Sequence, residues 1–135
     1  MTVGVKVMAL DFGAARTGVA VSDATGTLAR PVTVVERAAT AAGLRRLAEL
    51  VTSEEPERIV VGLPLTLRGE AGAQAEETDR FVAALRGAVS VPVEQFDERF
   101  TTTLAARNPG ASSPEDARAA AHLLESYLAW ASDRA

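Results

Sequence analysis

Apolar residues in the first third of the chain follow the pattern of β-strands. Val5–Asp11 is an apolar run rich in β-branched residues, which predicts a strand buried on both faces. After a short loop flanked by Gly13 and Gly18, the apolar pattern resumes in Thr17–Ser22, and the two runs predict an antiparallel hairpin. Pro31–Glu36 predicts a third strand, with proline at its first position, where a missing N–H is tolerated.

Further along, apolar residues recur every three or four positions in three segments, which predicts three longer helices. Two of them are Ala39–Thr52 and Ala73–Arg86, and the third begins at Ser113 and continues to about Ser132. Ser113 is followed by a proline and two acids, the residue types typical of a helix N-terminus. The remaining expected elements are the strands Arg58–Val61 and Val91–Phe96, a glycine-rich loop at Leu65–Gly72 and a short helix at Thr101–Arg107.

These elements follow the order β-β-β-α-β-α-β-α-α, without a repeat or a linker. The order predicts a single α/β domain over residues 1–135. No stretch approaches the roughly 18 uninterrupted apolar residues of a membrane span. The first apolar run contains Lys6 and ends in Asp11, which favours a strand over a secretory signal. The chain has no cysteine, which excludes disulfides and thiolate metal sites and suits a reducing cytoplasm, the expected location.

The formal net charge of −4 argues against a protein that coats nucleic acid by bulk attraction. It does not exclude an enzyme that meets nucleic acid at one metal-loaded site. The charge would be zero without four acids that stand at informative places. Asp11 ends the first predicted strand, Asp97 and Glu98 follow the fifth, and Asp116 opens the last helix. If the first, fourth and fifth strands are parallel, the first three of these acids share one edge of the sheet, where open α/β sheets bind ligands.

Converging carboxylates at that edge predict a site for Mg²⁺ or Mn²⁺, which prefer oxygen ligands and keep several waters. Two such ions roughly 4 Å apart can catalyse phosphodiester hydrolysis. Each acid also has a simpler interpretation: a turn residue for Asp11, a solvated turn for the Asp97–Glu98 pair, and a helix-capping acid for Asp116. No histidine or cysteine pattern competes as a metal site, and the single histidine, His122, has no motif partner that would indicate a Ser-His-Asp triad.

Four motifs resemble, in order, those of the YqgF/RuvX family of pre-16S rRNA nucleases and relatives of Holliday-junction resolvases. Leu10–Gly13 with Arg16–Asp23 resembles the opening LDhGxxRhGVAhSD, where h is hydrophobic, and Val60–Leu65 resembles VVGLPL. Asp97–Thr102 is similar to DERhTT, and the segment from Asp116 to Leu124 is similar to DxxAAxxhL. One such motif would be weak evidence, but the ordered set spans nearly the whole chain.

The resemblance implies an RNase H-like fold: a five-stranded mixed sheet flanked by helices, with the first three strands antiparallel and the first, fourth and fifth parallel. It implies a metal-dependent nuclease, with nucleic acid as the partner and two Mg²⁺ or Mn²⁺ ions as cofactors. Either a monomer or a homodimer is compatible with it. The implied catalytic and metal-binding residues are Asp11, Asp97, Glu98 and Asp116, and the candidates to hold phosphate are Arg16, Arg99, Thr101 and Thr102. Strand parity leaves open which member of the Asp97–Glu98 pair touches metal.

The other polar or aromatic residues are expected to be structural. Asp23 and Glu94 are assigned to turns or the surface, and His122 to a structural place in the last helix. Tyr127 and Trp130 are expected to pack that helix rather than to stack on bases.

The chain departs from the family between DERhTT and the final acid, where members usually carry a longer connection rich in lysine and arginine. Here Leu104–Glu115 is short, and Arg107 is its one basic residue. Two other functions stay open. A non-catalytic nucleic-acid-binding domain could keep the fold, although all three acidic clusters are present. The glycine-rich opening motif also resembles the phosphate-binding hairpin of the actin and Hsp70 group, which needs a second domain that 135 residues do not supply.

Overall fold

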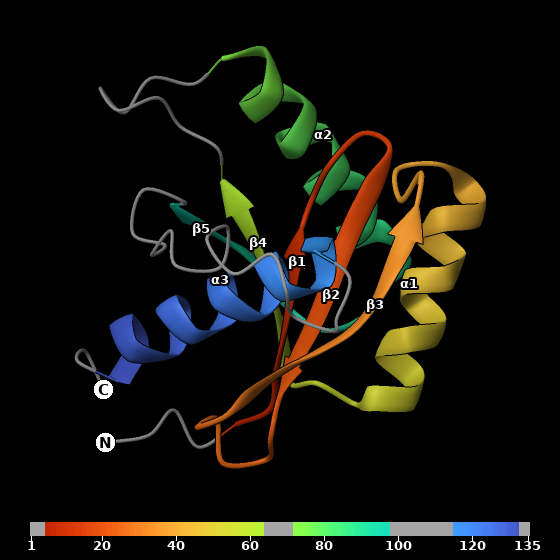
Figure 1. Ribbon diagram of the computed structural model, residues 1–135. Helices are drawn as coiled ribbons and strands as arrows, with labels where there is room; N and C mark the ends of the chain where they lie inside the picture. The colour runs from red at the N-terminus through yellow and green to blue at the C-terminus, as the bar shows by residue number, and fades with distance from the viewer. Residues whose placement is uncertain (1–4, 64–71, 98–114, 133–135) are drawn as a thin grey trace.

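Five strands form one mixed sheet at the centre of the computed structural model, which describes residues 5–63, 72–97 and 115–132 (Figure 1). Their order across the sheet is β3-β2-β1-β4-β5. β1 pairs with β2 and β2 with β3 in antiparallel fashion, while β4 is parallel to both β1 and β5. This is the sheet that the family resemblance implied. The strands span β1 Val7–Asp11, β2 Arg16–Ser22, β3 Ala29–Glu36, β4 Arg58–Leu63 and β5 Val93–Asp97.

Several strand boundaries differ from the prediction by one or two residues: β2 begins at Arg16, β4 ends at Leu63 and β5 ends at Asp97. β1 and β5 begin two residues later than expected, at Val7 and Val93. β3 begins earlier, at Ala29, so Pro31 lies inside the strand rather than at its start. The pairing with β2 shifts register at this point, and β3 is an edge strand, so the missing N–H of Pro31 leaves no inner ladder unpaired.

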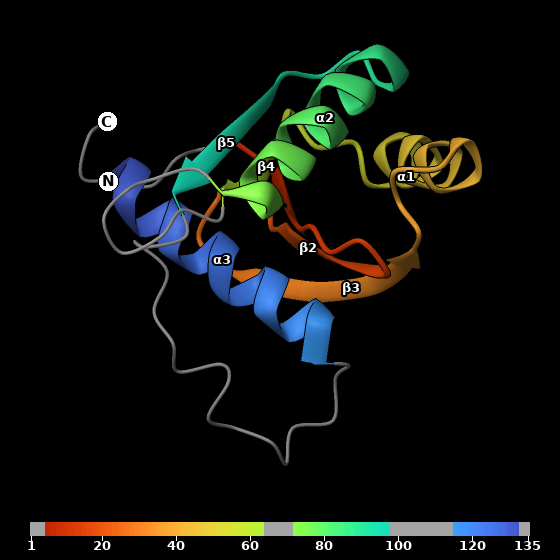
Figure 2. The same cartoon turned by 90° about the horizontal axis from the view of Figure 1, so that it is seen from above.

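Three helices cover the two faces of the sheet: α1 Ala41–Glu54 and α2 Ala73–Ala88 on one face, and α3 Glu115–Ser132 on the other (Figure 2). Thr40 caps α1, because its hydroxyl accepts a hydrogen bond from the N–H of Gly43 at 3.1 Å. The expected short helix at residues 101–107, the capping residue Ser113 and most of the glycine-rich loop lie outside the described residues. No helix in the described part of the chain is long and apolar enough to span a membrane.

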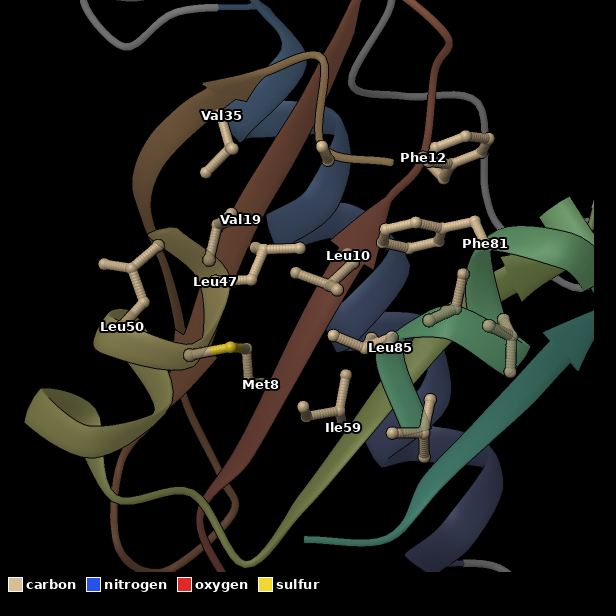
Figure 3. Close-up of a cluster of buried hydrophobic side chains, with 14 of the residues drawn as sticks. Met8, Leu10, Phe12, Val19, Val35, Leu47, Leu50, Ile59, Phe81 and Leu85 are labelled. Carbon is tan, nitrogen blue, oxygen red and sulfur yellow. The ribbon is translucent and has the colours of Figure 1, made fainter. Parts of the chain in front are cut away.

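Strand alternation divides the core into two clusters, one on each face of the sheet. Beneath α1 and α2, Met8, Leu10 and Ile59 of the strands meet helix residues such as Leu47 and Leu85 (Figure 3). The alternate strand residues pack against the apolar side of α3, which includes Leu124 and Leu128; these strand residues include Val7, Ala9, Ala20, Val60 and Phe96. The two clusters show which strand residues face α1 and α2 and which face α3. The alternation of side chains then indicates the face to which each strand-end residue is directed.

Candidate functional site

Asp11 ends β1 on the face of the sheet that α3 covers. Ala9 and Val7, two and four residues before it, pack in the cluster beneath α3. Phe12, the next residue, points the other way and stacks on Phe81 of α2, with ring centroids 4.3 Å apart (Figure 3). This aromatic contact fixes the alternation at the end of the strand, so the half-buried Asp11 faces α3.

Gly18 of β2 lies between Asp11 and Asp116. It is the direct partner of Asp11 in the antiparallel ladder. The first turn of α3 approaches the same glycine so closely that a Cβ atom there would lie 1.8 Å from the carbonyl oxygen of Asp116. Cβ atoms essentially never come within 3.0 Å of a heavy atom of a residue to which they are not bonded, so the approach requires glycine. Two acids about a hundred positions apart in the sequence are thus both neighbours of one residue.

Arg16 adds a side-chain contact to this arrangement. It lies two residues before Gly18 on the same face of β2, and its Nε is 3.3 Å from Oδ2 of Asp116. The hairpin loop before Arg16 is hydrogen-bonded to the residue that follows β3, because the N–H of Arg37 donates to the carbonyl oxygen of Ala15 at 3.0 Å. β2 therefore contacts both the backbone and the carboxylate of Asp116.

Asp97 reaches the same edge of the sheet as Asp11. It pairs with Leu63, the last residue of β4, and β4 in turn runs parallel to β1. The shared edge expected for the first two acidic clusters is therefore present in the sheet.

The side chains of β5 nevertheless divide between the two faces. Gln95 donates through Nε2 to Oδ1 of Asp79 on α2 at 2.8 Å, while Phe96 packs beneath α3. The alternation directs Asp97 to the α2 face, opposite to the face of Asp11. The structure thus brings Asp11 and Asp116 together on one face and assigns Asp97 to the other.

Four of the predicted site residues, Glu98, Arg99, Thr101 and Thr102, lie outside the described residues, so their roles stay predictions. Within the part of the chain that the structure describes, no three acidic, histidine or cysteine side chains gather closely enough to hold a metal ion. A ligand set of three would need a member beyond Asp11 and Asp116.

From the sequence, Gly18 was predicted only as a loop boundary and a motif position, and its close packing against α3 was not predicted. The available signal was a glycine inside a strand pattern, which commonly marks a close approach of another backbone. The sequence also could not show that Arg16, expected to hold phosphate, pairs with Asp116.

A second polar cluster lies beneath the C-terminal half of α3. Arg58 of β4 donates from Nη1 to the hydroxyl of Tyr127 at 3.0 Å, and that hydroxyl donates to Glu94 of β5. Burial and then the hydrogen bond to Glu94 raise the pKa of Tyr127 above its usual value. The hydrogen bond to Tyr127 is also the main cause that raises the pKa of Arg58. The cluster joins α3 to the β4–β5 side of the sheet.

Other expected structural residues have structural places. Asp23 accepts hydrogen bonds from the N–H groups of Thr27 and Leu28 at 2.8 and 3.2 Å, and the bond from Thr27 is the main cause that lowers its pKa. This confirms Asp23 as a turn residue. Tyr127 is buried and Trp130 packs against the cluster beneath α3, as expected for helix packing. His122 lies 3.5 Å from Glu125 on the same helix.

Comparison with known protein families shows the family to which the chain belongs. The model of RuvX, described as Holliday junction resolvase, matches residues 5–130. The chain belongs to the RuvX family. This family description denotes enzymes that hydrolyse phosphodiester bonds, so the chain is a hydrolase of a nuclease family, as the sequence predicted.

Individual relatives cover nearly the same span. A protein of Chloroflexus aurantiacus named "Putative pre-16S rRNA nuclease" is 42% identical over 130 residues, which cover 90% of this chain and 85% of the relative. A protein of Rubrobacter xylanophilus with the same name is 43% identical over 130 residues and covers 91% of each chain.

The fold resembles that of RuvC from Thermus thermophilus. The structure of that protein with a Holliday junction substrate aligns with a TM-score of 0.68 at 18% identity, over 96% of both chains. A second RuvC structure from the same organism aligns with a TM-score of 0.56 at 19% identity, over 93% of this chain and 96% of the other. The expected RNase H-like architecture is therefore confirmed at the level of the fold. Nucleases of this structural type depend on divalent metal ions.

The donor set at the edge of the sheet fits such ions. Asp11 and Asp116 offer carboxylate oxygens from one face, and both are partly exposed, so bound waters could complete a coordination shell. Carboxylate oxygens are the ligands that Mg²⁺ and Mn²⁺ prefer.

Proposed function

We propose that this protein is a divalent-metal-dependent nuclease that processes the 5′ region of pre-16S rRNA, with Asp11 and Asp116 as metal ligands. The observation that carries the proposal is the meeting of these two acids at Gly18, on the carboxyl-end edge of the sheet. The lack of cysteine fits a reducing cytoplasm, the location that we propose.

For the third carboxylate we propose Glu98 rather than Asp97. Gln95 contacts α2 and Phe96 packs beneath α3, so the alternation assigns Asp97 to the α2 face. Glu98, the other member of the predicted pair, is therefore our candidate for the third carboxylate.

Two Mg²⁺ or Mn²⁺ ions at these carboxylates would supply an activated water and stabilise the leaving oxygen. The protein residues hold and orient the groups that react. Asp11 is set rigidly by the ladder to β2 and by the stacking of Phe12 on Phe81, which favours a fixed ligand position. We propose that Arg16, Arg99, Thr101 and Thr102 hold phosphates of the substrate by charge and hydroxyl donors.

For the substrate we favour a flexible RNA strand over a four-way junction. Curated relatives carry the name of pre-16S rRNA nucleases, whereas the family model is described as a Holliday junction resolvase. Each phosphate contact contributes about 0.9 to the salt slope of duplex binding, and a junction needs many such contacts. The chain is acidic at −4, and Arg107 is the one basic residue in Leu104–Glu115. A frayed or single strand requires fewer contacts.

The test offers RNA carrying the 5′ region of pre-16S rRNA and a four-way DNA junction side by side, each with Mg²⁺ and with Mn²⁺, at one salt concentration. We expect the single-stranded or frayed RNA to be cleaved faster. Faster symmetric, paired incision of the junction would contradict this preference and would indicate that a homodimer supplies the missing contacts. Metal-dependent binding without cleavage of either substrate would favour the non-catalytic alternative.

A further inference from the structure

We propose that Arg16 competes with the divalent metal for the carboxylate of Asp116, so that metal binding frees the guanidinium beside the site for a phosphate of the nucleic acid. This inference rests on the proposed function, since it takes Asp116 as a metal ligand. It adds a coupling between metal binding and substrate binding, carried by one side chain.

The first observation is that the ion pair uses the oxygen that a metal would need. Nε of Arg16 lies 3.3 Å from Oδ2 of Asp116. While this contact persists, that carboxylate oxygen already has a cationic partner. The guanidinium also places a positive charge beside the position of a bound dication, which it repels.

The second observation is that the pair can be exchanged at little cost. The side chain of Arg16 is 65% exposed and that of Asp116 is 41% exposed. Pairs with this exposure are screened by water and contribute little to stability. A divalent ion with several carboxylate ligands can therefore displace the arginine.

The third observation is that the backbones of both residues are held by contacts other than the ion pair. The backbone of Asp116 packs on Gly18, where no side chain separates α3 from β2. Arg16 is held in β2 by its pairing with Glu36 of β3. Only the two side chains need to rotate, so the released guanidinium remains next to the metal ligands, where a bound phosphate would lie.

The direction in which metal affinity changes when Arg16 is removed separates competition from a positioning role of Arg16. If Arg16 competes with the metal, its removal frees Asp116 and removes a repelling charge, so the metal binds more tightly. If Arg16 instead orients Asp116 toward the metal, its removal makes the metal bind more weakly.

The experiment measures the dissociation constant of Mn²⁺ alone by isothermal titration calorimetry, without nucleic acid, for the wild type, Arg16→Ala and Arg16→Gln. The matched control is Arg30→Ala. Arg30 is 61% exposed and its Nη2 lies 3.1 Å from Oε1 of Glu54, so the control removes the same charge from a similar ion pair elsewhere on the sheet. Thermal unfolding of every variant checks that it is folded, and Arg16→Gln keeps a long polar side chain in case the alanine variant fails to fold.

We expect both Arg16 variants to bind Mn²⁺ about threefold to fivefold more tightly than the wild type, the range of an exposed ion pair. The affinity of Arg30→Ala should be unchanged. Equal or weaker binding by the Arg16 variants, in a protein whose wild type binds Mn²⁺, would overturn the competition and leave the proposed function standing. Equal tightening in Arg30→Ala would also overturn it, because bulk charge would then explain the effect. A wild type that does not bind Mn²⁺ would overturn the proposed function, and this inference with it.

Discussion

At the scale of single residues, the absence of a Cβ atom at Gly18 allows Asp116 to lie near the strand that pairs with Asp11. Gly18 lets the first turn of α3 reach β2, and so brings Asp116 to the strand that pairs with Asp11. Two carboxylates on one face repel each other, and the neighbouring Arg16 offsets part of that repulsion. Gly18 and the stacked Phe12 thus position the two acids, although neither of them is acidic.

The choice between Asp97 and Glu98 gives a prediction at this scale. Glu98→Gln should lower cleavage at least about 100-fold, because a metal ligand is lost, while Asp97→Asn should keep activity within about tenfold. The measurement is single-turnover cleavage of the same RNA by both folded variants. The opposite ranking would contradict the choice of Glu98 as the third carboxylate.

The sequence could predict that Asp11 ends a strand and that Asp116 lies at the start of a helix, because both boundaries are visible in the hydrophobic pattern. It could not separate Asp97 from Glu98, since the parity of a strand is ambiguous at its last residue. The contacts of Gln95 with Asp79 and of Phe96 beneath α3 support the proposal that Asp97 is directed to the α2 face, and both are long-range contacts that no local pattern contains.

At the scale of elements, α3 is attached to the sheet at both ends. Its first turn packs on Gly18, and its C-terminal half is held by the hydrogen bonds of Tyr127 to Arg58 and Glu94. Phe96 supports the same half, with its ring 5.6 Å from both Tyr127 and Trp130 in edge-on arrangements. The position of Asp116 therefore depends on packing along the whole helix.

Replacement of Gly18 tests the first attachment. Gly18→Ala places a methyl group against the carbonyl oxygen of Asp116, so α3 must shift, at a cost of about 1–3 kcal/mol in the free energy of unfolding. We expect reduced Mn²⁺ affinity and reduced cleavage as well, because Asp116 moves away from Asp11. The measurements are chemical unfolding followed by the fluorescence of Trp130, the one tryptophan, and Mn²⁺ calorimetry.

The control is Gly87→Ala on α2, where a Cβ atom would have no neighbour within 4 Å. This change should stabilise the protein by about 0.5–1 kcal/mol, because alanine favours the helix, and should leave cleavage unchanged. A Gly18→Ala variant as stable and as active as this control would contradict the close packing of α3 on β2.

Replacement of Tyr127 tests the second attachment. Tyr127→Phe should lower the free energy of unfolding by about 1–2 kcal/mol at neutral pH, because Arg58 and Glu94 lose a buried partner. The folded-state pKa of Tyr127 lies above the ordinary value of 10.0. Its stabilising effect is therefore complete below pH 10 and is lost as the pH rises through the folded value.

The measurement is urea unfolding of wild type and Tyr127→Phe at a series of pH values that begins at about pH 8 and continues above pH 10. The difference in stability should shrink above about pH 10. Tyr127 is the chain's one tyrosine, so its ionisation can be followed directly by absorbance. A tyrosine that titrates at its ordinary value or below would contradict the buried cluster.

At the scale of the whole molecule, the described helices cover both faces of the sheet, α1 and α2 on one and α3 on the other, and Asp11 and Asp97 lie at the edge formed by the strand ends. The sequence predicted the strands and the longer helices well, because fully buried strands and amphipathic helices carry strong and different periodicities, while the topology of the sheet was implied by the family resemblance. It misplaced the start of β3 because Pro31 normally marks a strand boundary, whereas here a register shift in an edge strand accommodates it.

The folded protein as a whole should respond to the metal. Acids held together in the native state repel one another, so bound Mn²⁺ should raise stability by roughly 2.7 kcal/mol at 100 times its dissociation constant. The measurement is the melting temperature at increasing Mn²⁺, with an equal ionic strength of Na⁺ as the control. A melting temperature that does not respond to millimolar Mn²⁺ would indicate that the native protein holds no metal site.

The most direct test of the proposed metal-dependent nuclease is the cleavage rate of Asp11→Asn, because Asp11 is the acid whose position is fixed by both the ladder and the aromatic stack. The control is Asp23→Asn, the same substitution at a turn acid. With saturating Mn²⁺ and RNA carrying the 5′ region of pre-16S rRNA, Asp11→Asn should keep the fold and lose at least about 100-fold in rate, while Asp23→Asn cleaves like the wild type. Near-wild-type cleavage by a purified, folded Asp11→Asn protein would contradict the assignment of this edge as the active site.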